Sequence, residues 1–217
     1  RKNDQGSSDG GKVYLLLGSS LGSPGESSSL SDADHGFYGE IEDGWVGYQA
    51  SGAGDVDGDG RADILIGAHM SDDGAGRVYL YLGSGLVPGD LSAEMAELQF
   101  TGQYPADQAG RSIAPAGDVD GDGLDDILIG ARNHWDGYGT AYLVLGASMS
   151  PGRHSVEDSD YAFDGEESGD EAGYTVSTAG DVNADGLDDI LVGAWQGDHE
   201  SLDSLEGKAY LLLAPAD

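Results

Sequence analysis

The chain has 217 residues, of which 38 are Gly, and its 41 acidic against 9 basic side chains give a formal net charge of -32. This charge repels nucleic acid and anionic membrane surfaces, which leaves cations and basic or neutral ligands as natural partners. No apolar run approaches the roughly 20 residues of a membrane-spanning helix, so membrane insertion is not expected. The glycines lack a three-residue period, which excludes collagen, and the absence of Cys excludes disulfides and thiolate metal sites.

The first predicted strand is an apolar run that follows a polar segment beginning at Arg1, without an initiator Met. Four copies of this strand occur: GKVYLLLG from Gly11, GRVYLYLG from Gly76, GTAYLVLG from Gly139 and GKAYLLLA from Gly207. The first copy has no acidic loop before it, whereas the others do. We therefore expect a mature, cleaved or truncated product that begins partway through a repeated unit.

The repeated unit is 63 residues long. Three segments align without a gap: GYQASGAGDVDGDGRADILIGA from Gly47, GRSIAPAGDVDGDGLDDILIGA from Gly110 and GYTVSTAGDVNADGLDDILVGA from Gly173. Short β-branched and apolar runs separated by Gly, Asp and Ser clusters predict four strands in each repeat. In the first full repeat, these strands are expected over residues 47–54, 63–69, 76–82 and 97–101. Four-stranded units are typical of β-propeller blades, whereas the repeats of a solenoid, the alternative, are usually about 20 to 45 residues long.

The loop between the first two strands of each repeat carries oxygen ligands at loop positions 1, 3, 5 and 9. These are Asp55, Asp57, Asp59 and Asp63; Asp118, Asp120, Asp122 and Asp126; and Asp181, Asn183, Asp185 and Asp189. The backbone carbonyl at position 7 supplies a further oxygen, at Arg61, Leu124 and Leu187. Hard oxygen donors without imidazole or thiolate favour calcium over zinc or copper. We therefore expect three Ca²⁺ sites, one in each loop.

Two alternatives to this interpretation are weaker. An EF-hand requires Glu at position 12, but here that position holds Ile66, Ile129 or Val192 within a predicted strand. Metal-free Asp-Gly turns are common in hairpins. Three such loops in register argue against them, because four carboxylates within one turn repel each other unless a cation neutralises them.

The three aligned segments that begin at Gly47, Gly110 and Gly173 resemble FG-GAP repeats when they are taken together with the preceding aromatic-Gly pair and the following GxxYLxLG strand. FG-GAP repeats are the units of the integrin α-subunit propeller and its bacterial relatives. The resemblance covers nearly the whole chain. It implies a seven-bladed all-β propeller of four-stranded antiparallel blades, with calcium in hairpin loops on the lower face and ligands on the opposite face. The loop residues given above are the metal ligands that it implies.

The chain departs from the family pattern at a few positions. Ala184 replaces the Gly found at 58 and 121, Asn183 replaces an Asp, and the last strand ends in Ala214 instead of Gly. The third metal site is therefore the most divergent.

About three blades are expected, which is too few to close a ring. The predicted divisions are residues 1–38 (the last two strands of a blade), 39–102 and 103–165 (two whole blades), and 166–217 (the first three strands of a further blade). We therefore expect a fragment completed by the remaining blades of the same propeller, with assembly from a second copy as the alternative.

The face opposite the metal loops is expected to carry the remaining connections. They contain His69 and Met70; His134, Trp135 and Tyr138; and Trp195, His199 and an insertion over residues 201–205. Aromatic side chains beside polar groups bind sugars or protein partners, and the alternative is that they pack between blades or simply lie on the surface.

No catalytic residues are predicted, because the chain has no Cys nucleophile and its acidic groups are assigned to metal turns. Weak calcium sites fill outside the cell, where calcium is abundant. The sequence thus predicts a secreted or cell-surface adhesion or protein-binding module that is not an enzyme. A lectin-like propeller and an ancillary domain of a secreted enzyme are the alternatives.

Overall fold

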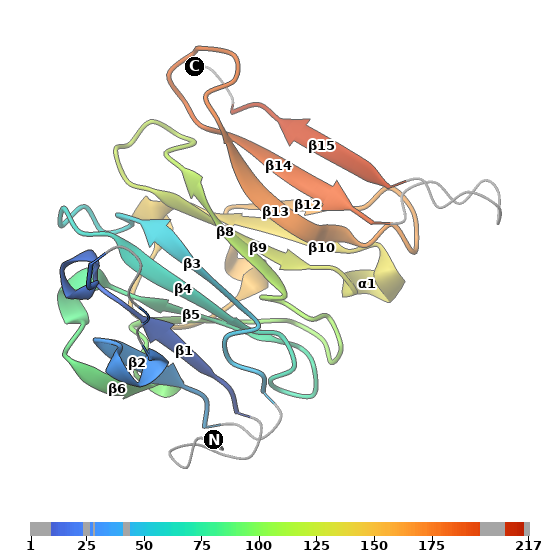
Figure 1. The fold of residues 1–217 in the computed structure, drawn as a ribbon. Helices are drawn as coiled ribbons and strands as arrows, with labels where there is room; N and C mark the ends of the chain where they lie inside the picture. The colour runs from blue at the N-terminus through green and yellow to red at the C-terminus, as the bar shows by residue number, and fades with distance from the viewer. Residues whose placement is uncertain (1–9, 24–26, 28, 41–43, 196–206, 215–217) are drawn as a thin grey trace.

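The computed structural model describes residues 10–23, 27, 29–40, 44–195 and 207–214. These residues form short β-strands joined by turns, together with six 3-10 turns and one short helical turn, α1 (His134–Gly137). The strands form four sheets that follow one another in chain order (Figure 1). The predicted all-β fold, a partial β-propeller, is confirmed.

The two central sheets have the same antiparallel order of four strands. They contain β3 (Gln49–Gly54), β4 (Asp63–Ala68), β5 (Arg77–Tyr81) and β7 (Leu98–Thr101), and then β8 (Ser112–Gly117), β9 (Asp126–Ala131), β10 (Thr140–Val144) and β12 (Tyr161–Asp164). The outer sheets are smaller and contain β1 (Lys12–Leu15) and β2 (His35–Tyr38), and β13 (Ala172–Gly180), β14 (Asp189–Ala194) and β15 (Lys208–Leu212). The 3-10 turns are Gly18–Ser20, Leu30–Asp32, Gly83–Gly85, Ala93–Met95, Gly146–Ser148 and Val156–Asp158.

Two strands that the sequence analysis did not anticipate connect neighbouring sheets. β6 (Gly89–Ser92), from the connection between β5 and β7, pairs in parallel with β2 of the preceding sheet. β11 (Gly152–Ser155), from the connection between β10 and β12, likewise pairs in parallel with β7. Each connection therefore adds an outermost strand to the preceding blade before it returns to its own.

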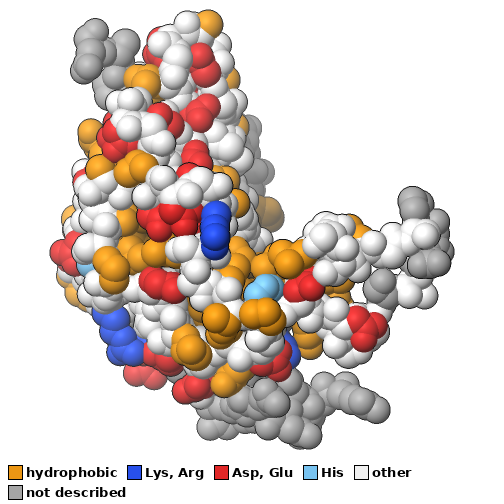
Figure 2. All heavy atoms as spheres, turned by 90° about the vertical axis from the view of Figure 1, so that its left-hand side faces the viewer, with side chains coloured by type: hydrophobic (Ala, Val, Ile, Leu, Met, Phe, Trp, Pro, Cys, Tyr) orange, Lys and Arg blue, Asp and Glu red, His pale blue; other side chains and the backbone are white. Residues whose placement is uncertain are grey.

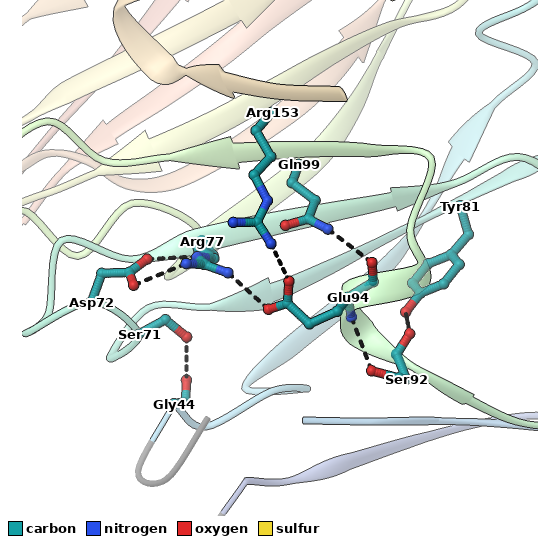
Figure 3. Close-up of polar contacts among 9 residues, drawn as sticks. All are labelled: Gly44, Ser71, Asp72, Arg77, Tyr81, Ser92, Glu94, Gln99 and Arg153. Carbon is teal, nitrogen blue, oxygen red and sulfur yellow. Dashed lines mark hydrogen bonds and ion pairs between the residues drawn. The ribbon is translucent and has the colours of Figure 1, made fainter. Parts of the chain in front are cut away.

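Polar contacts reinforce this crossing at the second sheet (Figure 3). Glu94, in the turn before β7, accepts a hydrogen bond from Arg77 Nη1 at 2.8 Å and also pairs with Arg153 of β11. Asp72 holds Arg77 from the other side, with 2.6 Å between its Oδ2 and Arg77 Nε. Because the Arg153 side chain is 64% exposed, its ion pair contributes at most about 1 kcal/mol. The backbone pairing of β11 with β7 therefore carries most of the link.

The core consists of three clusters of buried side chains between successive sheets. On β4, Ile64 and Ile66 pack in the cluster of the first sheet, whereas Leu65 packs in the cluster that includes Ile113 of the third. Because both faces of the sheet are covered, β4 is an uninterrupted apolar run instead of an alternating one. Complete burial of one such side chain stabilises the fold by about 1.5–3 kcal/mol.

The outer face of the fourth sheet is open in the described part of the chain. Leu65 and Leu128 occupy the same repeat position and are both 0% exposed, whereas their equivalent Leu191 on β14 is 37% exposed. On the same sheet, Leu211 is 49% exposed. Within the described residues, β15 has no strand on its outer side.

Candidate calcium site

The three acidic loops connect β3 to β4, β8 to β9, and β13 to β14. They lie at the same ends of the sheets, on the left and upper left of Figure 1, while α1 lies at the opposite ends. Figure 2 views the molecule from the side of the loops, where acidic side chains form several groups and basic ones are few. We refer to these segments as loop 1 (residues 55–63), loop 2 (118–126) and loop 3 (181–189).

In each loop, the carboxylate at position 1 accepts hydrogen bonds from backbone amides later in the same loop. In loop 1, Asp55 Oδ1 accepts a hydrogen bond from the Asp59 amide at 3.0 Å, and Oδ2 accepts one from the Gly60 amide at 2.8 Å. Asp181 makes the equivalent contacts with the amides of Asp185 and Gly186, at 3.1 and 3.0 Å. The tight turn therefore forms because a side-chain oxygen satisfies its inward-pointing amides.

The carboxylate at position 9 connects the loop to the end of the third strand of its blade. Asp126 is completely buried, and its two oxygens accept the amides of Val119 and Gly146, both at 2.8 Å. Asp63 and Asp189 make the same pair of contacts. In loop 3, Ala214 donates the second of these hydrogen bonds, so its replacement of Gly leaves the contact intact.

Positions 1, 3 and 9 converge in the first two loops. Asp55, Asp57 and Asp63 each offer an oxygen, and these atoms all lie within 4.8 Å of one another. Asp118, Asp120 and Asp126 form the same group in loop 2. This all-oxygen set suits a hard divalent cation such as Ca²⁺.

The position 5 carboxylates lie outside these two groups. Oδ1 of Asp59 accepts the Arg61 amide, and Oδ1 of Asp122 accepts the Leu124 amide, each at 2.8 Å. In loop 3, Asn183 Nδ2 donates to Asp185 Oδ2 at 2.8 Å, so the two side chains at positions 3 and 5 are hydrogen-bonded to each other. The three position 7 carbonyls, of Arg61, Leu124 and Leu187, stay a prediction as ligands.

Burial makes the charge of two position 9 carboxylates unfavourable, those of Asp63 and Asp126. It raises the pKa of Asp63 above the ordinary value, although the amides of Gly83 and Val56 oppose the shift. Burial also raises the pKa of Asp126 to about 6, opposed by its two amide donors and assisted by Asp120 and Asp122. A cation among these carboxylates would favour their ionised form and remove this penalty.

The sequence analysis missed two residues at position 8, which connect neighbouring loops. Asp125 Oδ2 of loop 2 accepts the Asp55 amide of loop 1 at 2.7 Å. Asp188 Oδ2 of loop 3 accepts the Asp118 amide of loop 2 at 3.2 Å. The sequence signal for these residues was the consecutive Asp pair at positions 8 and 9 of loops 2 and 3. Loop 1 has Ala62 before Asp63 instead.

Comparison with known proteins identifies the repeat. The family model described as FG-GAP repeat matches residues 46–81, 109–145 and 172–212, which together make up more than half of the chain. The chain belongs to the FG-GAP repeat family. The matched segments of this FG-GAP chain contain all three acidic loops and the strands on either side of them.

Integrin alpha subunits are among the relatives of this FG-GAP chain. It is 31% identical to integrin alpha-IIb from Mus musculus over 172 residues, covering 74% of the chain and 16% of the integrin. It is 33% identical to integrin alpha-PS2 from Drosophila melanogaster over 182 residues, covering 79% of the chain and 11% of that protein. The chain thus spans less than a fifth of the length of these curated relatives. No helix among the described residues is long and apolar enough to cross a bilayer.

On the side opposite the loops, the candidate ligand-binding residues divide into buried and exposed groups. His69 and His134 are 4% and 3% exposed and pack against neighbouring aromatic rings, so the packing alternative holds for them. Trp135 and Trp195 are more than half exposed, and Met70 and Tyr138 are also exposed. His199 and residues 201–205 lie outside the described residues.

A cavity on that side is lined by Trp135 and by residues of two neighbouring connections: Tyr104, Asp107, Asn133, Asp136 and Tyr138. Trp135 and Asp136 have φ values of 49° and 53°, in the left-handed region that favours Gly. His134 is stacked behind Trp135 with 5.3 Å between ring centres, and its Nδ1 lies 3.0 Å from Asp107 Oδ2. The buried His134–Asp107 pair thus supports the wall of this cavity.

Proposed function

We propose that this chain is a calcium-binding, extracellular β-propeller module that acts in adhesion or protein-ligand binding and has no catalytic role of its own. The observation that carries the proposal is the pair of in-register carboxylate groups in loops 1 and 2, each with one buried member. The family membership and the likeness to integrin alpha subunits support the adhesive or ligand-binding role.

In this proposal, one Ca²⁺ binds in each loop. The ligands are the oxygens at positions 1, 3, 5 and 9 and the position 7 carbonyl, with Asn183 supplying a neutral amide oxygen in loop 3. A shift of the position 5 side chain brings its carboxylate to the metal. The metal then favours the ionised forms of Asp63 and Asp126, because it compensates for their loss of hydration.

Thermal unfolding with and without calcium tests this part of the proposal. A ligand at about 100 times its dissociation constant adds roughly 2.7 kcal/mol of stability for each site. We expect 1 mM Ca²⁺ to raise the melting temperature above that in EGTA, and Mg²⁺ at the same concentration to raise it less. The variant Asp57→Ala should reduce the calcium response. Asp73→Asn, which removes a charge from a connection on the opposite side, should not. A melting temperature that is the same in calcium and EGTA would refute calcium binding.

The ligand is proposed to bind at the cavity beside Trp135. Exposed aromatic side chains next to polar groups are frequent at binding hot spots, and the left-handed backbone at Trp135 and Asp136 is typical of functional sites. A protein ligand is the first candidate and a glycan the second. Arrays of basic peptides and of glycans, probed in calcium, distinguish the two. We expect Trp135→Ala to abolish the signal while the calcium-dependent melting temperature stays unchanged. A Trp135→Ala signal equal to that of the wild type would place the ligand elsewhere.

A further blade of the same kind, or alternatively a second copy of the chain, is proposed to cover the fourth sheet. Leu191 and Leu211 are exposed where the equivalent side chains of inner blades are buried. Sedimentation velocity distinguishes the two partners: a dimer that the variant Leu211→Glu dissociates would support the second copy, and a monomer would support further blades. Extracellular residence follows from the weak affinity expected of such sites, and secretion of the chain by its native cells would test it.

A further inference from the structure

The calcium loops of neighbouring blades are in direct contact. Asp125 holds both backbone polar groups of Asp55: its Oδ2 accepts the Asp55 amide at 2.7 Å, and its own amide donates to the Asp55 carbonyl at 3.1 Å. One blade further along, Asp188 holds Asp118 with distances of 3.2 and 3.0 Å. The same arrangement therefore occurs at two independent junctions between blades.

The glycine before each loop provides the room for this contact. A Cβ atom on Gly54 would lie 2.2 Å from Asp125 Oδ2, and one on Gly117 would lie 2.0 Å from Asp188 Oδ2. Both glycines also have φ of 82°, which other residues rarely adopt. The chain before each loop is thus shaped to admit a carboxylate from the next blade.

The bridging residue belongs to two sites at once. Asp125 stands between Leu124 and Asp126, which are the proposed ligands at positions 7 and 9 of loop 2. Its side chain, however, fixes the backbone of Asp55, which is the ligand at position 1 of loop 1. Ordering loop 2 around a metal therefore fixes the residues on both sides of Asp125 and presents its carboxylate to loop 1.

We propose that Asp125 and Asp188 are positioning residues that couple calcium binding between neighbouring loops, from loop 3 through loop 2 to loop 1. This inference rests on the proposed calcium function and adds that the sites fill cooperatively instead of independently. Because binding free energies are reciprocal, calcium in loop 1 also tightens loop 2. Loop 1 has Ala62 in place of the bridging carboxylate.

NMR titration of the 217-residue chain with CaCl₂ tests the coupling site by site. The amides of Gly60 and Gly123 donate to the position 1 carboxylates of loops 1 and 2, so they report the two sites separately. The variant Asp120→Ala disables loop 2 without touching loop 1. We expect it to raise the dissociation constant of loop 1 by at least about fivefold, a typical coupling between sites.

The bridging variants decide the mechanism. With Asp125→Ala already present, Asp120→Ala should change the dissociation constant of loop 1 by less than about twofold, because the carboxylate that accepts the Asp55 amide is gone and only the backbone hydrogen bond from residue 125 to the Asp55 carbonyl remains. Asp125→Asn keeps an oxygen for the Asp55 amide and should preserve the coupling. Asp73→Asn, a matched loss of one negative charge on the opposite side, should leave both sites unchanged.

Two outcomes overturn the proposal differently. If both glycine amides respond to calcium, but Asp120→Ala alters loop 1 equally with and without the Asp125 carboxylate, or not at all, the coupling through Asp125 is refuted and the calcium function stands. If neither amide responds to calcium in the folded chain, the calcium function itself fails, and the coupling fails with it.

Discussion

Acidification should destabilise the junction between the first two blades through His69. This side chain is 4% exposed, its Nδ1 has no hydrogen-bond partner among the described residues, and its ring lies 4.2 Å from that of Tyr48 and 5.7 Å from that of Trp45. Burial, followed by the positive charges of Arg111 and Arg132, lowers the pKa of His69 from 6.5 to about 4. The folded protein therefore keeps His69 neutral where the unfolded chain protonates it.

The sign and size of the effect follow from this shift. Between pH 6.5 and 4, the unfolded state binds a proton that the folded state does not, so stability decreases as the pH falls through this range. One pKa unit corresponds to about 1.4 kcal/mol, so His69 alone should remove about 2 kcal/mol between pH 7 and pH 5 and about 3 kcal/mol by pH 4.

Urea unfolding at pH 7 and pH 5, in EGTA, measures this loss in the wild type and in His69→Phe. The Phe variant keeps an aromatic ring at the same position and cannot be protonated. Because carboxylates titrate equally in both proteins, the difference between their pH-dependent losses isolates His69. A loss that is the same in both proteins would show that His69 is protonated in the folded state, and the burial argument would be wrong.

Four further changes have defined outcomes. We expect loop 3 to empty first in a chelator titration, because Asn183 gives it fewer ligand charges. Asn183→Asp adds a charge and should tighten calcium binding in loop 3, whereas Asp120→Asn should weaken binding in loop 2 to about the level of loop 3. A loop 3 that empties last would contradict the charge argument. Ala184 has φ of 62°, so Ala184→Gly should relieve backbone strain and raise the unfolding free energy by about 0.5–1 kcal/mol, after the greater freedom of Gly in the unfolded chain is subtracted. Arg153→Gln, which removes only the exposed ion pair to Glu94, should lower that free energy by less than about 1 kcal/mol in urea unfolding; a larger loss would assign the cross-blade link to this ion pair.

The four main strands of the two central blades were predictable from the sequence, because they repeat every 63 residues and include apolar runs such as DILIG in β4 and β9. Ile64, Leu65 and Ile66 are apolar because each face of their sheet packs on a different neighbour. β6 and β11 were not predictable in this way. Their sequences, GDLS and GRHS, are short and polar, and they become strands only because the edge of the preceding blade offers free backbone groups.

The candidate site was partly predictable for a similar reason. The spacing of loop carboxylates indicated which oxygens converge, and positions 1, 3 and 9 do so in the first two loops. The role of Asp125 depends on which loop lies beside it, and that contact joins residues 70 positions apart. Likewise, the burial of His69 depends on Trp45 and Tyr48, which belong to the connection that enters the blade.

The crossing of β6 and β11 to the preceding blade affects how such a chain can grow or shrink by gene duplication. A 63-residue segment contains the four main strands of one blade and one strand donated to the preceding blade, wherever the ends of the segment are placed. Its duplication would therefore supply a new blade together with the strand that fastens it, and its deletion would remove both. The number of blades can thus change in whole repeats without leaving a donated strand unpaired or an inner edge bare.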